Sequence, residues 1–253
     1  MEFLDVATAR GMDGLRVAIA RGVPSPWGMA AMAMFQHHNI PFVAVEQKGG
    51  QDNPELVEWS RHRNAPVVMY NDESPRVRWH EIMTLAERIG SGASLVPDNI
   101  DDRMRMVGII SELADEGGLV WQARMGMLKA GHKAQGDDAL KTPMFKEYGY
   151  SPEAVEKSQS RIQDIIGMLM KQVAAQNAAG SKYLIGNSLT AADIYWAFFS
   201  QPFKISPPEI NPMEEPMRSV WAAGGKAFES IDQAIFDQRD YIFANYIKTP
   251  MEF

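Results

Sequence analysis

A serine between a strand pattern and a helix pattern is the residue of this sequence best placed to do chemistry. Ser25 stands in the stretch VPSPWGMAAM, after the apolar strand pattern of residues 15–20 and before a predicted helix over residues 27–38. A side chain at this position points to the N-terminal end of the helix, where amide N–H groups and the helix dipole favour an anion. Two interpretations stay open: the hydroxyl interacts with an anionic reactant, or it only caps the helix.

The composition excludes several other kinds of chemistry. The 253 residues include no cysteine, which excludes disulfides, a cysteine nucleophile, cysteine–metal sites and CxxC redox chemistry. His37 and His38 have no partner at metal-ligand spacing, so we predict that they are structural and that the protein holds no metal.

Charge and hydropathy also limit the partners. A net charge of −7 without a long basic run argues against a nucleic-acid surface. No apolar run approaches the length of a membrane span, and the N-terminus lacks the basic start and apolar core of a secretory signal. We therefore expect a cytoplasmic protein that binds neither nucleic acid nor membrane.

The first part of the chain alternates strand and helix patterns after a loose lead-in over residues 1–14. Strands are predicted over residues 15–20, 42–45, 67–70 and 76–79, and helices over residues 27–38, 54–61 and 81–89. A hairpin turn joins the last two strands, whereas helices separate the others, so the four-stranded sheet should be mixed. This is the order of a thioredoxin-like α/β domain.

Every periodic segment after the linker at residues 90–97 reads as a helix. Helices are predicted over residues 100–129 (bent at 117–118), 152–179, 190 onward, 217–231 and 233–246, with an irregular connector over 131–149 and a loop over 203–216. We therefore expect an α/β domain over residues 1–94 and an all-α domain over residues 95–253.

A helix that begins at Thr190 is predicted to lie in the core of the second domain. Thr190 and Asp193 form a capping box, Leu189 and Ile194 can close a hydrophobic staple, and residues 194–199 are apolar or amphipathic almost all round. A thioredoxin-like domain followed by an all-helical domain with such a core helix resembles the architecture of the glutathione transferase superfamily. That family has a cis proline at the start of the third strand, so the resemblance implies that the Ala65–Pro66 bond is cis.

The resemblance also implies a role for Ser25. In serine-type glutathione transferases the hydroxyl hydrogen-bonds the sulfur of glutathione and favours the thiolate, which is the nucleophile. Glutathione would then be the co-substrate, a small hydrophobic electrophile would be the second substrate, and detoxification would be the physiological role. The family resemblance further implies a homodimer.

The other implied glutathione contacts are Ala65, Pro66, Gln47, Arg63 and Glu81, of which Glu81 would receive the ligand's ammonium group. The serine that follows this acid in the family is replaced by Ile82. We expect the Ile82 amide to remain available at the helix start, so that carboxylate binding is weakened by about 1.5–3 kcal/mol rather than abolished.

The electrophile is expected to contact Trp27, Met104, Trp121 and Met125, where the long helix of residues 100–129 faces the first domain. Methionines in such clusters either fill a core or line an adaptable apolar pocket, and both interpretations stay open here.

Two functions are compatible with these residues. One is an enzyme that adds the glutathione thiolate to a hydrophobic electrophile, with conjugation, ether cleavage or isomerisation as the net outcome. The other is a protein of the same fold that binds apolar ligands or a protein partner without chemistry. Ser25 favours the first function, and Ile82 favours the second.

Overall fold

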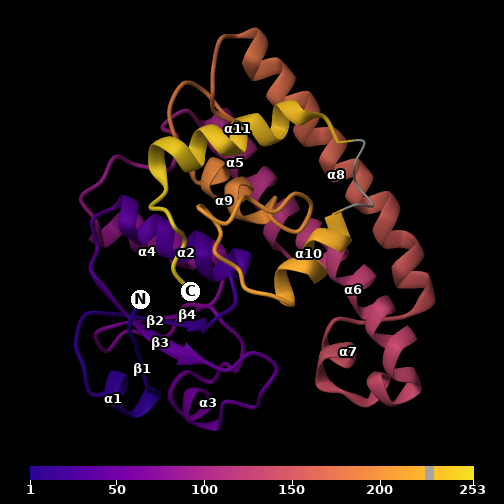
Figure 1. The fold of residues 1–253 in the computed structure, drawn as a ribbon. Helices are drawn as coiled ribbons and strands as arrows, with labels where there is room; N and C mark the ends of the chain where they lie inside the picture. The colour runs from indigo at the N-terminus through magenta and orange to yellow at the C-terminus, as the bar shows by residue number, and fades with distance from the viewer. Residues whose placement is uncertain (226–230) are drawn as a thin grey trace. The chain divides into compact units, whose positions relative to one another are not determined.

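The computed structural model describes residues 1–225 and 231–253, which form two compact units (Figure 1). Unit 1 comprises Met1–Leu95, Ser206–Met213 and Phe243–Phe253, and unit 2 comprises Val96–Ile205 and Glu214–Ile242. The two later segments of unit 1 fall in the range expected for the helical domain. They are joined to each other by a hydrogen bond from the Met251 amide to the Ile210 carbonyl, 2.8 Å long.

Unit 1 is built on a mixed four-stranded sheet in the order β1-β3-β2-β4. Its strands are β1 (Phe3–Leu4), β2 (Leu15–Ala20), β3 (Phe42–Gln47) and β4 (Val67–Tyr70). β3 pairs in parallel with β1 and β2, and β4 runs antiparallel to β2. β2 lies in the middle of the sheet and is buried along its whole length, which agrees with a sequence that is apolar except for Arg16.

The mixed four-stranded sheet is confirmed, but its fourth strand was predicted in the wrong place. Residues 76–79 contribute only an isolated bridge between Arg76 and Val68. The fourth strand is β1, in the segment predicted to be a loose lead-in, and α1 (Val6–Arg10) follows it. A two-residue strand has no periodicity to detect, whereas the cap of α1 was visible as Asp5, which accepts a hydrogen bond from the Thr8 amide (2.7 Å).

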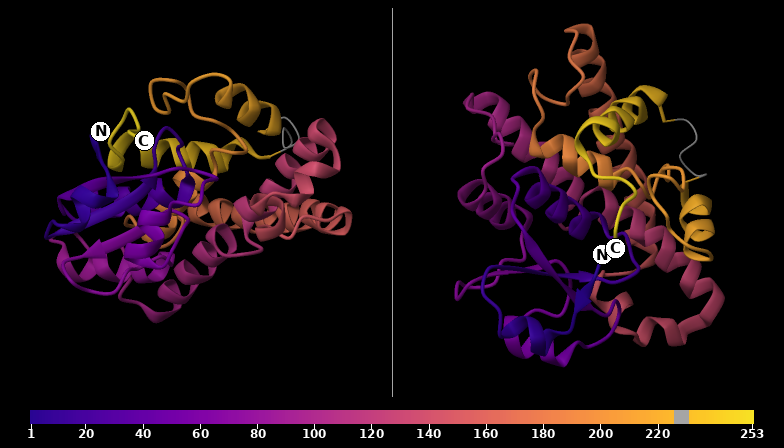
Figure 2. Two further views of the ribbon diagram at one scale, coloured as in Figure 1. Left: turned by 90° about the horizontal axis from the view of Figure 1, so that it is seen from below. Right: turned by 60° about the vertical axis from the view of Figure 1, so that its left-hand side comes forward.

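Four helices cover the sheet of unit 1. Besides α1 they are α2 (Pro26–His37), α3 (Pro54–Ser60) and α4 (Trp79–Ile89). α2 and α4 lie together on one face and α1 and α3 on the other (Figure 1), and the right-hand view of Figure 2 shows the same layers. α4 begins two residues before the predicted start, because Trp79 joins the helix with its side chain buried instead of ending a strand.

The two histidines at the end of α2 are structural, as predicted. His38 is buried and its Nε2 lies 3.0 Å from Glu87 of α4, while His37 Nε2 lies 2.8 Å from the Ala93 carbonyl oxygen. A Cβ at Gly90 would overlap His38, so glycine is needed there for the close approach.

Unit 2 is all-helical, as predicted. It contains α5 (Ile100–Ala114), α6 (Leu119–Gln135), a 3-10 helix η1 (Gly136–Lys141), α7 (Pro143–Glu147), α8 (Pro152–Ala178), α9 (Ala191–Phe199), α10 (Met217–Gly225) and most of α11 (Gln233–Tyr246). The part of the predicted helix at residues 226–230 lies outside the described residues. Among the described helices, none combines the length and the apolar character that a membrane crossing needs.

The predicted long helix over residues 100–129 is wrong. α5 ends at Ala114, Gly117 has a positive φ of 82°, and α6 starts after Gly118. A Cβ on Gly118 would lie 2.9 Å from the carbonyl oxygens of Asp115 and Glu112, so the chain turns tightly here instead of bending as one helix. The predicted irregular connector is also largely helical, because α6 continues to Gln135 and is followed by η1 and α7.

The predicted core helix is α9, and every residue in it is buried. The Thr190 amide donates to Asp193 Oδ2 (2.9 Å), as the capping box requires, and the Thr190 hydroxyl donates to the same oxygen (2.8 Å). The Leu184 amide and Gln238 Nε2 donate to Oδ1 (2.7 and 2.8 Å). Burial raises the pKa of the Asp193 carboxyl to about 6, against the opposing effect of these hydrogen bonds.

This raised pKa predicts how the stability depends on pH. Since the pKa of an unfolded aspartate is about 3.9, the folded state binds the extra proton between roughly pH 4 and pH 6. The stabilisation is therefore complete below the unfolded pKa and is lost as the pH rises through about 6. We expect the difference in unfolding free energy between the wild type and Asp193→Asn to fall by about 2 kcal/mol from pH 4 to pH 7.

Urea unfolding of both proteins at matched pH values measures this difference. The asparagine side chain of the variant cannot titrate, and the other carboxyl groups cancel in the comparison because both proteins carry them. A difference that increases with pH would mean that the hydrogen bonds, not burial, decide the charge of Asp193.

Candidate functional site

Ser25 lies where β2 ends and α2 begins, as the sequence predicted. The intervening loop is tight, since the Val23 amide donates to the Ala20 carbonyl (3.3 Å) and the Ser25 amide donates to the Val23 carbonyl (2.7 Å). Pro26 is the first residue of α2 and restricts Ser25 to an extended backbone, with φ −57° and ψ 122°. The backbone of Ser25 is therefore fixed by its neighbours in the chain.

The Ser25 hydroxyl does not cap the helix. The Ser25 carbonyl accepts a hydrogen bond from the Met29 amide (2.9 Å), whereas no amide of the described α2 donates to the Ser25 side chain. The residue is half-buried at the positive end of the helix dipole. The capping interpretation thus fails, and the hydroxyl can interact with an anion instead.

Gly28 is a contributor to this site that sequence reasoning missed. A Cβ at this position would lie 3.1 Å from Cγ2 of Ile19 in β2. The first turn of α2, which follows Ser25 directly, approaches the strand closely because residue 28 has no side chain. A glycine in the first turn of an otherwise alanine- and methionine-rich helix was the available signal.

Strand register brings three of the predicted site segments to one edge of the sheet. Ala20, which precedes the Ser25 loop, pairs with Gln47 at the end of β3. Val67, which follows Pro66 and opens β4, pairs with Ala18 of β2. The ends of β2 and β3 and the start of antiparallel β4 therefore meet at the edge where ligands commonly bind in α/β sheets.

The segments at this edge are fixed by their own contacts. The Ala65–Pro66 bond is cis, which confirms the prediction. Gln47 is buried, and its Nε2 donates to the carbonyl oxygens of Lys48 and Arg63 (both 3.2 Å). Gln47 thus ties the loop after β3 to the segment before Pro66, which is a positioning role that the sequence did not predict.

Glu81 is an anion at the start of α4. Its Oε2 accepts hydrogen bonds from the amides of Val77 (3.3 Å) and Arg78 (3.2 Å). Burial by itself raises the pKa of Glu81, but these amide hydrogen bonds outweigh it and hold the pKa below its ordinary value. No described group hydrogen-bonds Oε1, so one carboxylate oxygen can accept an ammonium group.

The expectation for Ile82 requires a correction. Because α4 begins at Trp79, the Ile82 amide is already in the helical hydrogen-bond ladder and donates to the Arg78 carbonyl (3.0 Å). Its side chain is only 1% exposed and belongs to the core of unit 1. Neither group of Ile82 is available to a ligand carboxylate.

The residues expected to contact an electrophile differ widely in exposure. Trp27 of α2 and Trp121 of α6 are half-buried, and the Trp121 ring packs edge-on against Tyr148 at 4.7 Å between centroids. Met104 on α5 is 67% exposed. Met125 is buried in a cluster with Leu128, Ala139, Phe145 and Val155, where it fills the core of unit 2.

The sequence matches no family model and no curated protein, but it matches many solved structures. A glutathione transferase family member from Pseudomonas fluorescens, solved with two glutathione molecules bound, is 14% identical and has a TM-score of 0.64, with 95% of this chain and 94% of that chain covered. The chain has the glutathione transferase fold.

Two further solved structures share this fold. The β-etherase LigF from Sphingobium is 13% identical with a TM-score of 0.58, and 90% of this chain and 99% of that chain are covered. Ure2p in complex with glutathione is 11% identical with a TM-score of 0.57, and 89% of this chain and 98% of that chain are covered. At such identities the likeness concerns the glutathione transferase fold and not individual site residues.

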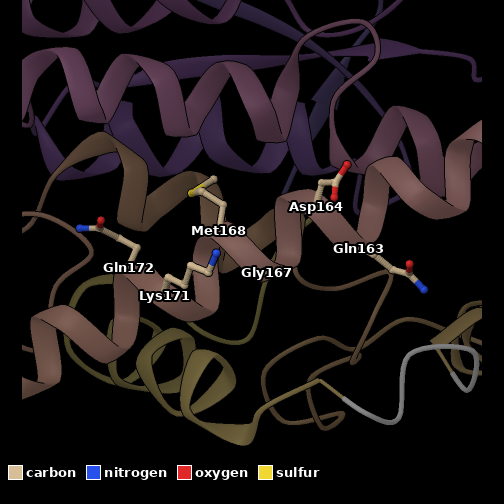
Figure 3. Close-up of a pocket in the computed structure, with 6 residues that line it drawn as sticks. All are labelled: Gln163, Asp164, Gly167, Met168, Lys171 and Gln172. Carbon is tan, nitrogen blue, oxygen red and sulfur yellow. The ribbon is translucent and has the colours of Figure 1, made fainter.

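Two described cavities lie outside the predicted site residues of this glutathione transferase fold. One, of about 460 Å³ in unit 2, is open and lies over one side of α8 (Figure 3). Its lining residues are Gln163, Asp164, Gly167, Met168, Lys171 and Gln172. The other, of about 280 Å³ in unit 1, is bordered by Asp5, Glu46, Lys48 and Asn53 among others. Neither contains Ser25.

Proposed function

We propose that the chain binds glutathione at the sheet edge of unit 1 and that Ser25 favours its thiolate for attack on a hydrophobic electrophile. The observation that carries the proposal is the Ser25 hydroxyl, which lies at the N-terminus of α2 without a capping role. Solved structures of the same fold with glutathione bound support this choice of ligand.

The chemistry follows from one hydrogen bond. The Ser25 O–H donates to the glutathione sulfur, and this donation favours the thiolate because a hydrogen bond to a charged acceptor is the stronger one. Such a bond contributes about 1.5–3 kcal/mol, which lowers the pKa of the bound thiol by about 1 to 2. The thiolate sulfur then forms the new bond to carbon, and the leaving group departs with the electron pair of the bond that breaks.

The remaining contacts are assigned by position. Glu81 receives the ligand ammonium group on Oε1, and Ala65 offers its backbone beside Pro66 at the same sheet edge. Gln47 and Arg63 hold the neighbouring loops in register, and Trp27, Met104 and Trp121 are the proposed contacts of the electrophile. Met125 acts from the core, by supporting α6.

A second candidate function is binding of glutathione or an apolar ligand without chemistry. Ile82 favours it, because its buried side chain and engaged amide leave the ligand carboxylate without the donor that the resemblance led us to expect. Under this alternative, Ser25 would contact a ligand but would not change the charge of its sulfur.

Calorimetric titration with glutathione and with S-methylglutathione tests both functions. If Ser25 favours the thiolate, glutathione binding should release protons at neutral pH, and the release should be absent with the S-methyl derivative. Binding of both without proton release would support the non-catalytic function, and no binding of either would refute the glutathione site.

We also propose a homodimer in the cytoplasm with a role in detoxification, as the resemblance implied. Light scattering at micromolar concentration would give the mass of about two 28.2 kDa chains. A mass equal to one chain would contradict the dimer.

A further inference from the structure

A hydrogen-bonded row of three side chains in unit 2 lies apart from Ser25. His132, near the end of α6, has its Nδ1 3.1 Å from Oη of Tyr150 and its Nε2 3.0 Å from Oδ1 of Asp137. Asp137 belongs to η1, and Tyr150 follows α7. An acid, an imidazole and a hydroxyl in this order form the arrangement that activates nucleophiles in many enzymes.

The carboxylate determines which nitrogen of His132 carries the proton. An ionised Asp137 can only accept, so Nε2 must hold the hydrogen and donate it. In the neutral imidazole Nδ1 then has a lone pair, and the Tyr150 O–H donates to it. The imidazole is thus oriented as a base toward the phenol, with a negative charge behind it that stabilises the imidazolium.

Tyr150 is also held in place. Its ring makes edge-on contacts with Phe145 (5.1 Å between centroids, 79°) and with His132 (5.5 Å, 83°). Phe145 is buried in a core cluster formed by α6, η1, α7 and α8, and Tyr150 packs against this cluster. Tyr150 remains half-buried, and the His132 side chain is 31% exposed, so the row of side chains lies partly at the protein surface.

We propose that Tyr150 is a nucleophile that accepts an acyl group from a small activated ester, with His132 as its general base and Asp137 as the positioning residue for His132. The phenol oxygen bonds to the ester carbonyl carbon, and its proton passes to Nδ1 of His132. The ester C–O bond breaks, and the alkoxide or phenoxide leaves with the electron pair. The product is an acylated Tyr150, formed in a single turnover.

This reaction does not depend on glutathione or on Ser25. Its test is therefore separate from the test of the proposed function. Tyr148 provides an internal comparison, since it is half-buried in the same segment but has no imidazole partner among the described contacts. Its ring packs against Trp121 and Arg124, and the Arg124 guanidinium also hydrogen-bonds its side chain.

Treatment of the full chain with p-nitrophenyl acetate, followed by peptide mapping, tests the proposal. We expect one acetyl group on Tyr150, added at least about tenfold faster than on Tyr148, because a positioned base contributes about 10²–10⁴-fold. Tyr150→Phe should lose this label, whereas the matched control Tyr148→Phe should keep it.

Two further variants test whether His132 acts as a base toward Tyr150 or only forms a structural hydrogen bond with it. His132→Asn can still accept the Tyr150 hydrogen bond but cannot take the proton, so labelling should fall at least about tenfold. Asp137→Asn, at a side chain that is 91% exposed, should preserve the fold and give an intermediate rate. Equal labelling of Tyr150 and Tyr148, acetylation confined to lysines, or an unchanged rate in His132→Asn would overturn the proposal.

Discussion

Replacing Ser25 with alanine is expected to lower kcat/KM for conjugation of glutathione about 10- to 150-fold at neutral pH while leaving the fold intact. The loss corresponds to one hydrogen bond to a charged sulfur, worth about 1.5–3 kcal/mol. The pH profile should move to higher pH by about 1 to 2, because the bound thiol keeps its proton more strongly without the donor. Conjugation of an aryl chloride, followed from pH 6 to 9, measures both effects.

The stability of the Ser25→Ala variant should change by less than about 0.5 kcal/mol. A serine that caps a helix contributes about 1 kcal/mol, but the Ser25 side chain makes no capping hydrogen bond. Ser25→Thr is the matched control, since it keeps a hydroxyl on the same carbon and should retain most of the rate. Equal rates and an unchanged pH profile in the alanine variant would show that Ser25 has no catalytic role.

Much of the fold was predictable because its longer helices and strands have a regular spacing of apolar residues or recognisable capping and turn residues at their ends. β2 and β4 match their predicted ranges, and α11 runs from Gln233 to Tyr246 as expected. The two incorrect predictions of secondary structure, at β1 and between α5 and α6, have local causes. β1 is too short to show an alternating pattern, and the apolar positions of α5 and α6 continue in phase across the turn at Gly117 and Gly118. Periodicity reports which face is buried and does not report a change of direction between two helices.

The candidate site was predictable only where backbone position alone decides the chemistry. Ser25 could be singled out because it precedes a predicted helix. The free backbone N–H groups and the dipole at a helix N-terminus favour anions whatever the side chains are. Gln47 could not be recognised as a positioning residue, since the carbonyl of Arg63 that its side chain holds is distant in sequence. Whether the Ile82 amide and side chain can reach a ligand depends on the residue at which α4 begins. Sequence patterns locate a helix start only to within a few residues.

The observed start of α4 at Trp79, instead of Glu81, reverses the effect on glutathione binding that is expected for Ile82→Ser. If α4 had begun at Glu81, a serine at position 82 would have added a donor beside free amides and tightened glutathione binding. With the start at Trp79, the side chain at position 82 lies in the core, and a serine hydroxyl would be buried. A serine inside a helix commonly bonds to the carbonyl four residues before it, here that of Arg78.

We therefore expect Ile82→Ser to destabilise the protein without improving affinity for glutathione. Removing a buried isoleucine side chain down to Cβ lowers the unfolding free energy by about 2–5 kcal/mol, and the serine variant should lose at least as much as Ile82→Ala. Ile82→Val, which loses a single methyl group, should cost about 0.5–1.5 kcal/mol. Urea unfolding ranks the three variants, and calorimetry on the folded fraction gives their affinities. Tenfold tighter binding in the serine variant, but not in the alanine variant, would mean that the hydroxyl reaches the ligand and that the start of α4 differs from the one described.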